Sequence, residues 1–319
     1  MDFKDIANEN RILEVRVGSH LFGTETEDSD LDLFGVFMPS KEMCFGFQVC
    51  NEVDLGIKSK DDTGRNTKDA VDRKLHEYRK FARLAMQNNP NILHLLWADE
   101  KNIIFKDEEG FADRLFEQAH LFPSQAAYHR FAAYAYSQKH KMLIKPKNYA
   151  ELERGLEILE NADDNMVMAE MKDVSPFKYE GKGKHVQLGD ISFEAGVYVK
   201  KARKMARRRL DNATSRHVLF SKHGFDSKFG ANLIQLLMEG IELMNTGRVQ
   251  FPLAYAHDIL DIKNGKYTAD EVVEWSEGLA KNARIAYEKT SLPAKPDAGK
   301  IEEFVIGEVS HFLQLRRQL

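Results

Sequence analysis

The chain has 319 residues, 43% hydrophobic and 30% charged, and its formal net charge is −4 at pH 7. This composition is typical of a folded globular protein and excludes an intrinsically disordered chain. No run of about 18 apolar residues predicts a membrane-spanning helix. The polar N-terminal segment differs from a secretory signal, so we expect a cytoplasmic protein. Cys44 and Cys50 are expected to be reduced and structural, because their spacing is not that of a zinc site.

The pattern that carries most chemical information lies in residues 11–38, RILEVRVGSHLFGTETEDSDLDLFGVFM. The β-branched residues of the segment 11–17 predict a strand, which Gly18-Ser19 ends. Ser19 is placed to begin a helical turn. A glycine lets the backbone approach a ligand closely, and the free N–H groups at the start of a helix bind phosphate.

A second strand is predicted over residues 31–38, with Asp30 at its start and Asp32 two residues further on. Side chains alternate between the two sides of a strand, so both carboxylates are expected on one face. Two carboxylates beside a phosphate-binding turn predict a site for Mg²⁺ and a nucleotide. An Asp-x-Asp sequence is also common in turns, where aspartates close Asx-turns, so the pair alone leaves both interpretations open.

The segments that follow predict the rest of a small sheet. Residues 41–57 are rich in Phe, Val and Cys and are interpreted as a hairpin or meander. Residues 58–70 are almost wholly polar and predict a loop, either a lid or a plainly solvated segment. The next block begins as a strand and becomes helical until Pro90 ends the helix. Taken by itself, Asp72 in this block is a solvated charge.

From about residue 107 the chain changes to long helices, predicted over 109–121, 124–143, 148–171, 268–289 and 299–319 by apolar residues at three- and four-residue spacing. Residues 174–193 predict a loop with a short hairpin. The fold class is therefore α+β, with a small mixed-sheet domain over residues 1–106 and an α-helical domain over residues 107–319.

A basic cluster follows the predicted hairpin. It could bind the backbone of RNA or tRNA or the triphosphate of a nucleotide, or form a solvated helix face that balances acidic neighbours. The members expected to contact RNA are Lys200, Lys204, Arg207 and Arg208. Lys201, Arg203 and Arg209 lie in the same segment.

The string GS-x3-G-T-x-T-x2-SD-x-D-x2-GV resembles the signature of the DNA polymerase β-like nucleotidyltransferase superfamily, whose catalytic domain has a palm-like mixed sheet. The closer similarity is to the YcgL-type, or RNA-ligase-associated (RlaP-like), predicted nucleotidyltransferases, which include bacteriophage members. We expect a T4-type bacteriophage protein acting in the host cytoplasm. The resemblance continues through Asp72, Lys80-Phe81 and Asn89-Pro90-Asn91.

A second part of the resemblance covers residues 225–247. The chain keeps Phe225-Asp226-x-Lys228 and Thr246-Gly247. It departs at Asn232, where the family more usually has His, and at Gln235, where it more usually has Arg. These departures place the family's second binding surface in question.

The resemblance implies transfer of an NMP from an NTP to an acceptor hydroxyl with release of pyrophosphate. Asp30, Asp32 and Asp72 would hold two Mg²⁺ ions, or Mn²⁺ ions in their place, about 3.5–4 Å apart. Asp69 and Glu77 are the alternatives to Asp72. The residues expected to bind the triphosphate are Gly18, Ser19, Lys80 and Lys228.

The acceptor expected from the family's association with RNA ligases is RNA or tRNA. Two other functions stay open. One is a protein AMP-transferase or antitoxin-like enzyme with the same carboxylates, and the other is a non-catalytic nucleotide- or RNA-binding module. The family resemblance does not choose among them, because relatives with one fold modify different acceptors.

Overall fold

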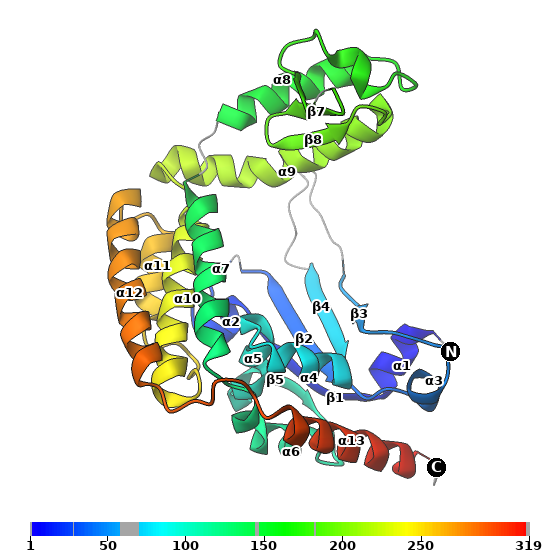
Figure 1. Cartoon of the computed structure of the whole chain (residues 1–319), viewed down its shortest axis with the longest axis vertical. Coiled ribbons are helices and arrows are strands. Elements are labelled where there is room, and N and C mark those ends of the chain that lie inside the picture. The colour runs from blue at the N-terminus through cyan, green and yellow to red at the C-terminus, as the bar shows by residue number, and fades with distance from the viewer. Residues whose placement is uncertain (1, 28, 58–69, 144–146, 182, 317–319) are drawn as a thin grey trace. The chain divides into compact units, whose positions relative to one another are not determined.

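The computed structural model of the chain describes residues 2–27, 29–57, 70–143, 147–181 and 183–316. The loop predicted over residues 58–70 lies, except for Ala70, outside these ranges. The chain forms two compact units, drawn together in Figure 1. Unit 1 comprises Met1–Gln138, Ala231–Ile262 and Val272–Leu319, and unit 2 comprises Lys139–Gly230 and Lys263–Glu271.

Unit 1 is built on a five-stranded mixed sheet, as the sequence predicts. The strand order is β3-β4-β2-β1-β5. Strands β2 and β4 are parallel, and the other neighbouring pairs are antiparallel. The strands are β1 (Arg11–Arg16), β2 (Leu31–Phe37), β3 (Glu52–Asp54), β4 (Val71–Glu77) and β5 (Ile103–Lys106).

Gly35 lies at the centre of this sheet, between two closely packed strands. It pairs with Leu75 of β4 on one side and with Glu14 of β1 on the other. A Cβ atom at Gly35 would lie 2.3 Å from the carbonyl oxygen of Leu13 and 2.5 Å from a methyl group of Leu75. The sheet therefore packs in this register only because residue 35 has no side chain.

Most helices of unit 1 pack around one hydrophobic core, which joins Val36 of β2 to Phe131, Leu243 and Phe312 of distant helices. Ile6 and Met43 belong instead to a second, smaller core of unit 1. Because the larger core is shared, the expected boundary at residue 106 is not the division that the chain has. Figure 1 shows the elements: α1 (Phe3–Glu9), α2 (Ser19–Phe22), α3 (Lys41–Phe45), α4 (Tyr78–Met86), α5 (Pro90–Leu93), α6 (Phe111–Glu117), α7 (Ala126–Met142), α10 (Ser227–Thr246), α11 (Ala256–Lys263), α12 (Ala269–Lys289) and α13 (Ala298–Leu315).

The expectation of a hairpin over residues 41–57 is wrong in its first half. Residues 41–45 form α3, because the Ser40 side chain accepts a hydrogen bond from the backbone N–H of Met43 and caps the helix. Two aromatic residues that favoured a strand are not in a core: Phe45 is 76% exposed and Phe47 is fully exposed. Only Glu52–Asp54 joins the sheet, as its edge strand β3.

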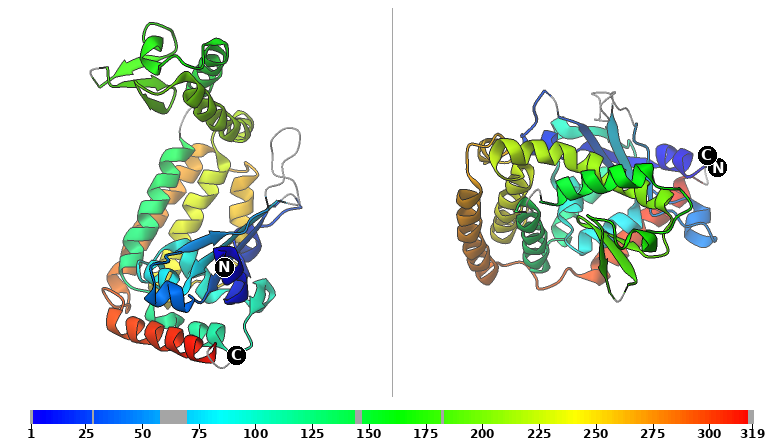
Figure 2. Two further views of the ribbon diagram at one scale, coloured as in Figure 1. Left: turned by 90° about the vertical axis from the view of Figure 1, so that its right-hand side faces the viewer. Right: turned by 90° about the horizontal axis from the view of Figure 1, so that it is seen from above.

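Unit 2 has its own hydrophobic core, which includes Leu156, Val186 and Ala202. Two helices, α8 (Lys147–Asn161) and α9 (Val199–His223), pack with a three-stranded antiparallel sheet, shown from two further sides in Figure 2. The predicted hairpin is thus three strands: β6 (Lys178–Glu180), β7 (His185–Leu188) and β8 (Ile191–Glu194). Within the described ranges, every helix is too short or too polar to cross a bilayer.

Candidate active site

The two aspartates predicted on different strands lie opposite each other in the sheet. In the parallel pairing of β2 with β4, Asp32 is the direct partner of Asp72. Residues that are partners across neighbouring strands point to the same face, and the strands lie about 4.8 Å apart. The sheet thus brings together two carboxylates that are 40 positions apart in the chain.

The Gly18-Ser19 turn lies directly against Asp32. Gly18 precedes α2 and has a φ of +63°, which L side chains rarely adopt. A Cβ atom at Gly18 would lie 2.7 Å from the Oδ2 atom of Asp32. The backbone N–H of Val17 also donates to the carbonyl oxygen of Asp32, at 2.9 Å. A glycine is therefore required where the start of α2 meets the carboxylate.

The electrostatics of Asp32 reflect an excess of negative charge. Burial, followed by the nearby charges of Asp72 and Asp30, raises the pKa of Asp32 to about 6, and His20 opposes the shift. Asp32 is half-buried, whereas Asp30 and Asp72 are exposed. Three carboxylates that repel one another at one end of a sheet are typical of a cation-binding site.

The chemistry of this donor set fits a hard divalent cation. Carboxylate oxygens are the ligands that Mg²⁺ prefers, and a cation among them would relieve the repulsion at Asp32. Among the described residues, no three His, Cys, Asp or Glu side chains already form a metal-coordinating group. The side chains of Asp30, Asp32 and Asp72 thus supply the charge and the ligand type, and no coordination geometry is assigned to them.

Helix α2 is held from behind by a buried aromatic and polar cluster. The ring of Phe22 contacts the rings of His94 and Phe251, with centroids 5.1 and 5.9 Å apart. His94 lies 3.0 Å from a carboxylate oxygen of Glu239, which is fully buried. The Gln235 side chain donates to the other carboxylate oxygen at 2.7 Å. Such a satisfied buried network favours one well-defined position of α2.

This network also shows where the two departures from the family pattern lie. Gln235 is buried and belongs to the core behind α2, so at this position the chain does not present a binding surface. Asn232 lies on the same helix, α10, and is exposed. The pairing of His94 with Glu239 across 145 positions carries no short-range sequence signal, and sequence reasoning missed it.

Lys80 does not lie with the carboxylates. It follows β4 in α4, whereas Asp72 is near the first residue of β4. The five residues from Asp72 to Glu77 span about 17 Å of strand. Glu77, an alternative third carboxylate, is buried and accepts hydrogen bonds from the backbone N–H groups of Arg79 and Lys80, so it caps α4. Asp69, the other alternative, lies outside the described residues.

Lys228 lies near the start of α10, in the part of that helix that belongs to unit 2. Its charge adds to burial in lowering the pKa of Lys263. The structure therefore places Lys228 near Lys263, and its expected contact with the triphosphate stays a prediction.

The basic cluster lies on α9, where its members divide into two sets. Three arginines form ion pairs within unit 2, namely Arg203 with Asp164, Arg207 with Glu160 and Arg209 with Asp190. The exposed members that have no ion pair among the described residues are Lys200, Lys201, Lys204 and Arg208. Tyr198, 59% exposed, precedes them. Arg207, expected to contact RNA, thus forms an ion pair with Glu160, whereas Lys201 has no ion pair among the described residues.

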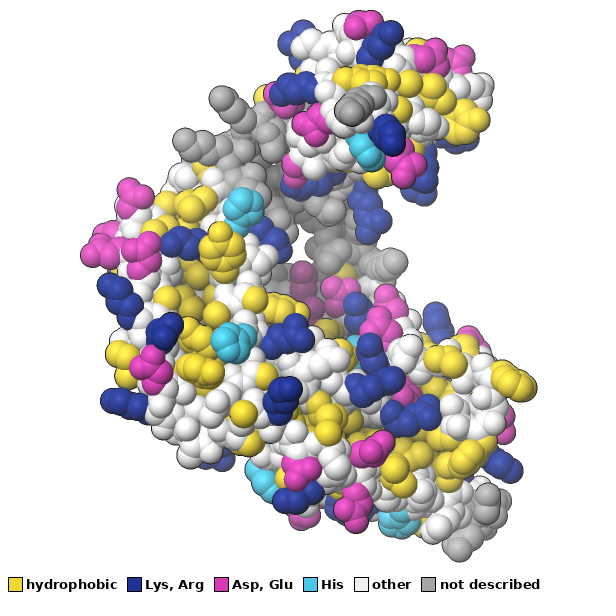
Figure 3. All heavy atoms as spheres, viewed as in Figure 1, with side chains coloured by type: hydrophobic (Ala, Val, Ile, Leu, Met, Phe, Trp, Pro, Cys, Tyr) yellow, Lys and Arg dark blue, Asp and Glu magenta, His cyan; other side chains and the backbone are white. Residues whose placement is uncertain are grey.

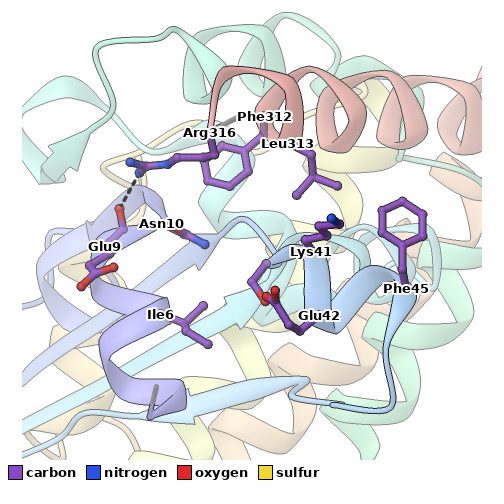
Figure 4. A pocket seen from close by; sticks show the side chains of 10 residues that line it. Ile6, Glu9, Asn10, Lys41, Glu42, Phe45, Phe312, Leu313 and Arg316 are labelled. Atoms are coloured by element: carbon purple, nitrogen blue, oxygen red, sulfur yellow. Dashed lines mark hydrogen bonds between the residues drawn. The ribbon is translucent and has the colours of Figure 1, made fainter. Parts of the chain in front are cut away.

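A separate hollow of about 260 Å³ lies at the opposite end of β2, between α1, α3 and α13. Figure 4 shows its lining, with Phe45 and Phe312 on opposite sides and the Arg316 guanidinium donating to the carbonyl oxygen of Glu9 at 3.1 Å. Apolar side chains surround this region on the surface of unit 1, at the lower right of Figure 3. The hollow has none of the three candidate aspartates, so it is not part of the candidate active site.

The mixed sheet and its N-terminal motif define a nucleotidyltransferase of the DNA polymerase β class. Residues 1–159 match the model of a family described as the RNA repair pathway DNA polymerase beta family. The N-terminal part of the chain is similar to that family, and the DNA polymerase β class implies transfer of an NMP.

One similar protein is the uncharacterized 38.9 kDa protein of the nrdC-mobD intergenic region of Enterobacteria phage T4. It is 22% identical over 302 residues, which are 86% of this chain and 88% of that protein. Among solved structures, a nucleotidyltransferase-like protein from Exiguobacterium sibiricum 255-15 aligns with 89% of this chain and 73% of its own. Its sequence identity is 9% and its TM-score is 0.25.

Proposed function

We propose that the chain is a Mg²⁺-dependent nucleotidyltransferase that moves an NMP from an NTP to a hydroxyl group of RNA or tRNA. The observation that carries this proposal is the position of Asp32 on β2. Asp72 of the neighbouring strand β4 lies on one side of it, and the Gly18-Ser19 turn that follows β1 lies on the other. A carboxylate beside a phosphate-binding turn is what nucleotidyl transfer requires.

Each candidate residue has a role in the proposed reaction that follows from its position. The backbone N–H groups at the start of α2 and the Ser19 hydroxyl bind the β- and γ-phosphates, for which Gly18 leaves room. Asp30, Asp32 and Asp72 would hold Mg²⁺, which would supply charge neutralisation for the attacking hydroxyl and the leaving pyrophosphate. The cluster behind α2 keeps the turn in place against Asp32.

The RNA acceptor is supported by the charge of α9 and by the family's description as an RNA repair family. Lys200, Lys201, Lys204 and Arg208 offer four exposed cations without ion pairs among the described residues. Unpaired cations on one helix bind a phosphate backbone, because each neutralised phosphate releases counterions.

The experiment that tests the function supplies each labelled NTP with Mg²⁺ or Mn²⁺ to the full-length protein, together with RNA, tRNA or lysate proteins. Label that accumulates on RNA, with stoichiometric pyrophosphate release, supports the proposal. Label on protein would replace it with a protein AMP-transferase. NTP binding without pyrophosphate release for every acceptor would identify a non-catalytic binding module. The double variant Asp30→Asn, Asp32→Asn is the control.

A further inference from the structure

A row of side chains lies next to the carboxylates on the same face of the sheet. On β4, Lys74 is two residues beyond Asp72, and on β2, Phe34 is two residues beyond Asp32. Phe34 and Lys74 are direct partners, as Asp32 and Asp72 are. Because side chains alternate along a strand, all four point to one face, and the second row lies about 7 Å from the first.

Lys74 is available to a ligand. Its side chain is exposed, and among the described residues its ammonium group has no ion pair within 4.0 Å. In the pairing of β4 with β3, Lys74 lies opposite Asp54. The Asp54 carboxylate instead accepts a hydrogen bond from the backbone N–H of Gly56, at 2.9 Å. An exposed lysine ammonium beside a site for phosphate transfer is suited to a phosphate group.

Phe34 provides an aromatic ring beside this cation. The ring is half-buried and is held by an edge contact with His76, with centroids 5.9 Å apart and an interplanar angle of 84°. Burial keeps the pKa of His76 low, so the imidazole is neutral at pH 7.5. A fixed ring next to a cation is the arrangement by which proteins bind single-stranded nucleic acid, with a base on the ring and a phosphate on the cation.

The strand order indicates which substrate this row faces. Strands β1 and β4 lie on opposite sides of β2. The phosphate-binding turn at Gly18-Ser19 follows β1, whereas Lys74 is on β4. In phosphoryl transfer the attacking and leaving oxygens lie roughly in line on opposite sides of the phosphorus. If the triphosphate lies on the β1 side of Asp32, the β4 side faces the acceptor.

We propose that Phe34 and Lys74 form the acceptor subsite, in which the terminal base of a single-stranded RNA stacks on Phe34 and its phosphate binds Lys74. The inference rests on the proposed function and specifies its acceptor. A structured or protein acceptor would have no use for this pair. Sequence reasoning named Lys80 and Lys228 for the triphosphate and did not consider Lys74, which the two-residue spacing from Asp72 places on the carboxylate face.

The test measures RNA binding and transfer separately with the full-length protein. For a labelled single-stranded RNA, the affinity is measured as a function of KCl concentration. We expect Lys74→Ala to reduce the slope of log affinity against log salt by about 0.7, the value for one contact with a single-strand phosphate. In the transfer assay it should raise the KM for RNA by roughly three- to tenfold and leave the KM for NTP unchanged.

Matched variants make the result specific. Arg16→Ala removes another exposed cation. Arg16 is opposite Leu33 in the pairing of β1 with β2, so its side chain lies on the other face of the sheet. This variant should leave the salt slope unchanged. Lys74→Arg should restore the slope. Phe34→Leu keeps an apolar side chain in the core and should raise the KM for RNA about tenfold through lost stacking. Thermal unfolding checks that each variant is folded.

The outcomes separate this inference from the proposed function. An unchanged salt slope in Lys74→Ala, or a KM for NTP that rises as much as the KM for RNA, overturns the acceptor subsite even if transfer to RNA occurs. A wild-type protein that binds no single-stranded RNA also overturns it. A reduced slope supports the subsite even if no NMP reaches RNA, in which case the proposed function fails alone.

Discussion

Replacing Asp32 with asparagine should stabilise the metal-free protein while abolishing nucleotidyl transfer. The half-buried carboxylate of Asp32 is repelled by Asp72 and Asp30, and its pKa is raised from 3.8 to about 6. Asparagine has nearly the same shape and no charge. Removing the charge relieves the repulsion, but it also removes the ligand on which Mg²⁺ binding depends.

The size of the stabilisation follows from the pKa shift. A shift of about 2 pKa units corresponds to about 3 kcal/mol of free energy of unfolding. Because Asp32 is only half-buried, solvent screening reduces the expected gain to about 1–1.5 kcal/mol. For a unit of this size, that gain raises Tm by about 2–5 °C.

The pH dependence has a definite sign. The pKa of Asp32 is higher in the folded than in the unfolded protein, so the wild type loses stability as the pH rises from about 4 to about 6. The variant lacks this loss. The difference in Tm between the two proteins should therefore be small at pH 4.5 and complete at pH 7.5.

The assay combines thermal unfolding in EDTA at both pH values with pyrophosphate release in Mg²⁺. Adding Mg²⁺ should raise the Tm of the wild type more than that of Asp32→Asn. Glu108→Gln, which removes an exposed carboxylate, should change Tm by less than about 1 °C. A variant that is less stable than the wild type at pH 7.5, or equally shifted at both pH values, would refute the reasoning.

Three further results are expected. Gly18→Ala should abolish transfer without unfolding the protein, since its methyl group would meet the Asp32 carboxylate at 2.7 Å; pyrophosphate release measures this. His94→Ala should lower the free energy of unfolding by about 3 kcal/mol, because it leaves one oxygen of the buried Glu239 carboxylate without its histidine partner; chemical denaturation measures this. Lys201→Ala should weaken RNA binding and reduce its salt slope by about 0.7, measured by titration with labelled RNA.

Two of these results have a matched control variant. His257→Ala removes a largely exposed histidine and should leave the free energy of unfolding nearly unchanged. Arg207→Ala removes a cation already paired with Glu160, so it should reduce the salt slope less than Lys201→Ala does. Equal effects within either pair of variants, or normal turnover in Gly18→Ala, would contradict the corresponding assignment.

The local pattern around the motif predicted the elements that carry the candidate site. The two strands and the short helix of residues 11–37 form as expected, because β-branched residues, a glycine and alternating side chains act over only a few positions. The parallel pairing of β2 with β4 is not a local property. The family resemblance was needed to select Asp72, since its partner Asp32 is 40 positions away.

The errors arose where packing or geometry overrode a plausible pattern. Phe45 and Phe47 favoured a strand, but the cap at Ser40 forms α3 instead and leaves both rings exposed. The role of Lys80 in binding the triphosphate came from the family resemblance and stays a prediction, and most of β4 separates this lysine from Asp72 along the sheet. The division of the chain depends on distant helices returning to the sheet, which periodicity alone does not indicate.

The absence of a side chain at Gly35 has a consequence for catalysis although Gly35 touches no substrate. If β2 slipped by one residue against β4, every side chain of β2 would exchange faces, and Asp32 would point away from Asp72. The tight fit of Gly35 between Leu13 and Leu75 opposes such a slip, because any larger residue brought to that place would collide with both strands. Gly35, the final glycine of the motif, thus fixes the register of β2 against β4. A sheet that assembles in this register places Asp32 and Asp72 on the same face.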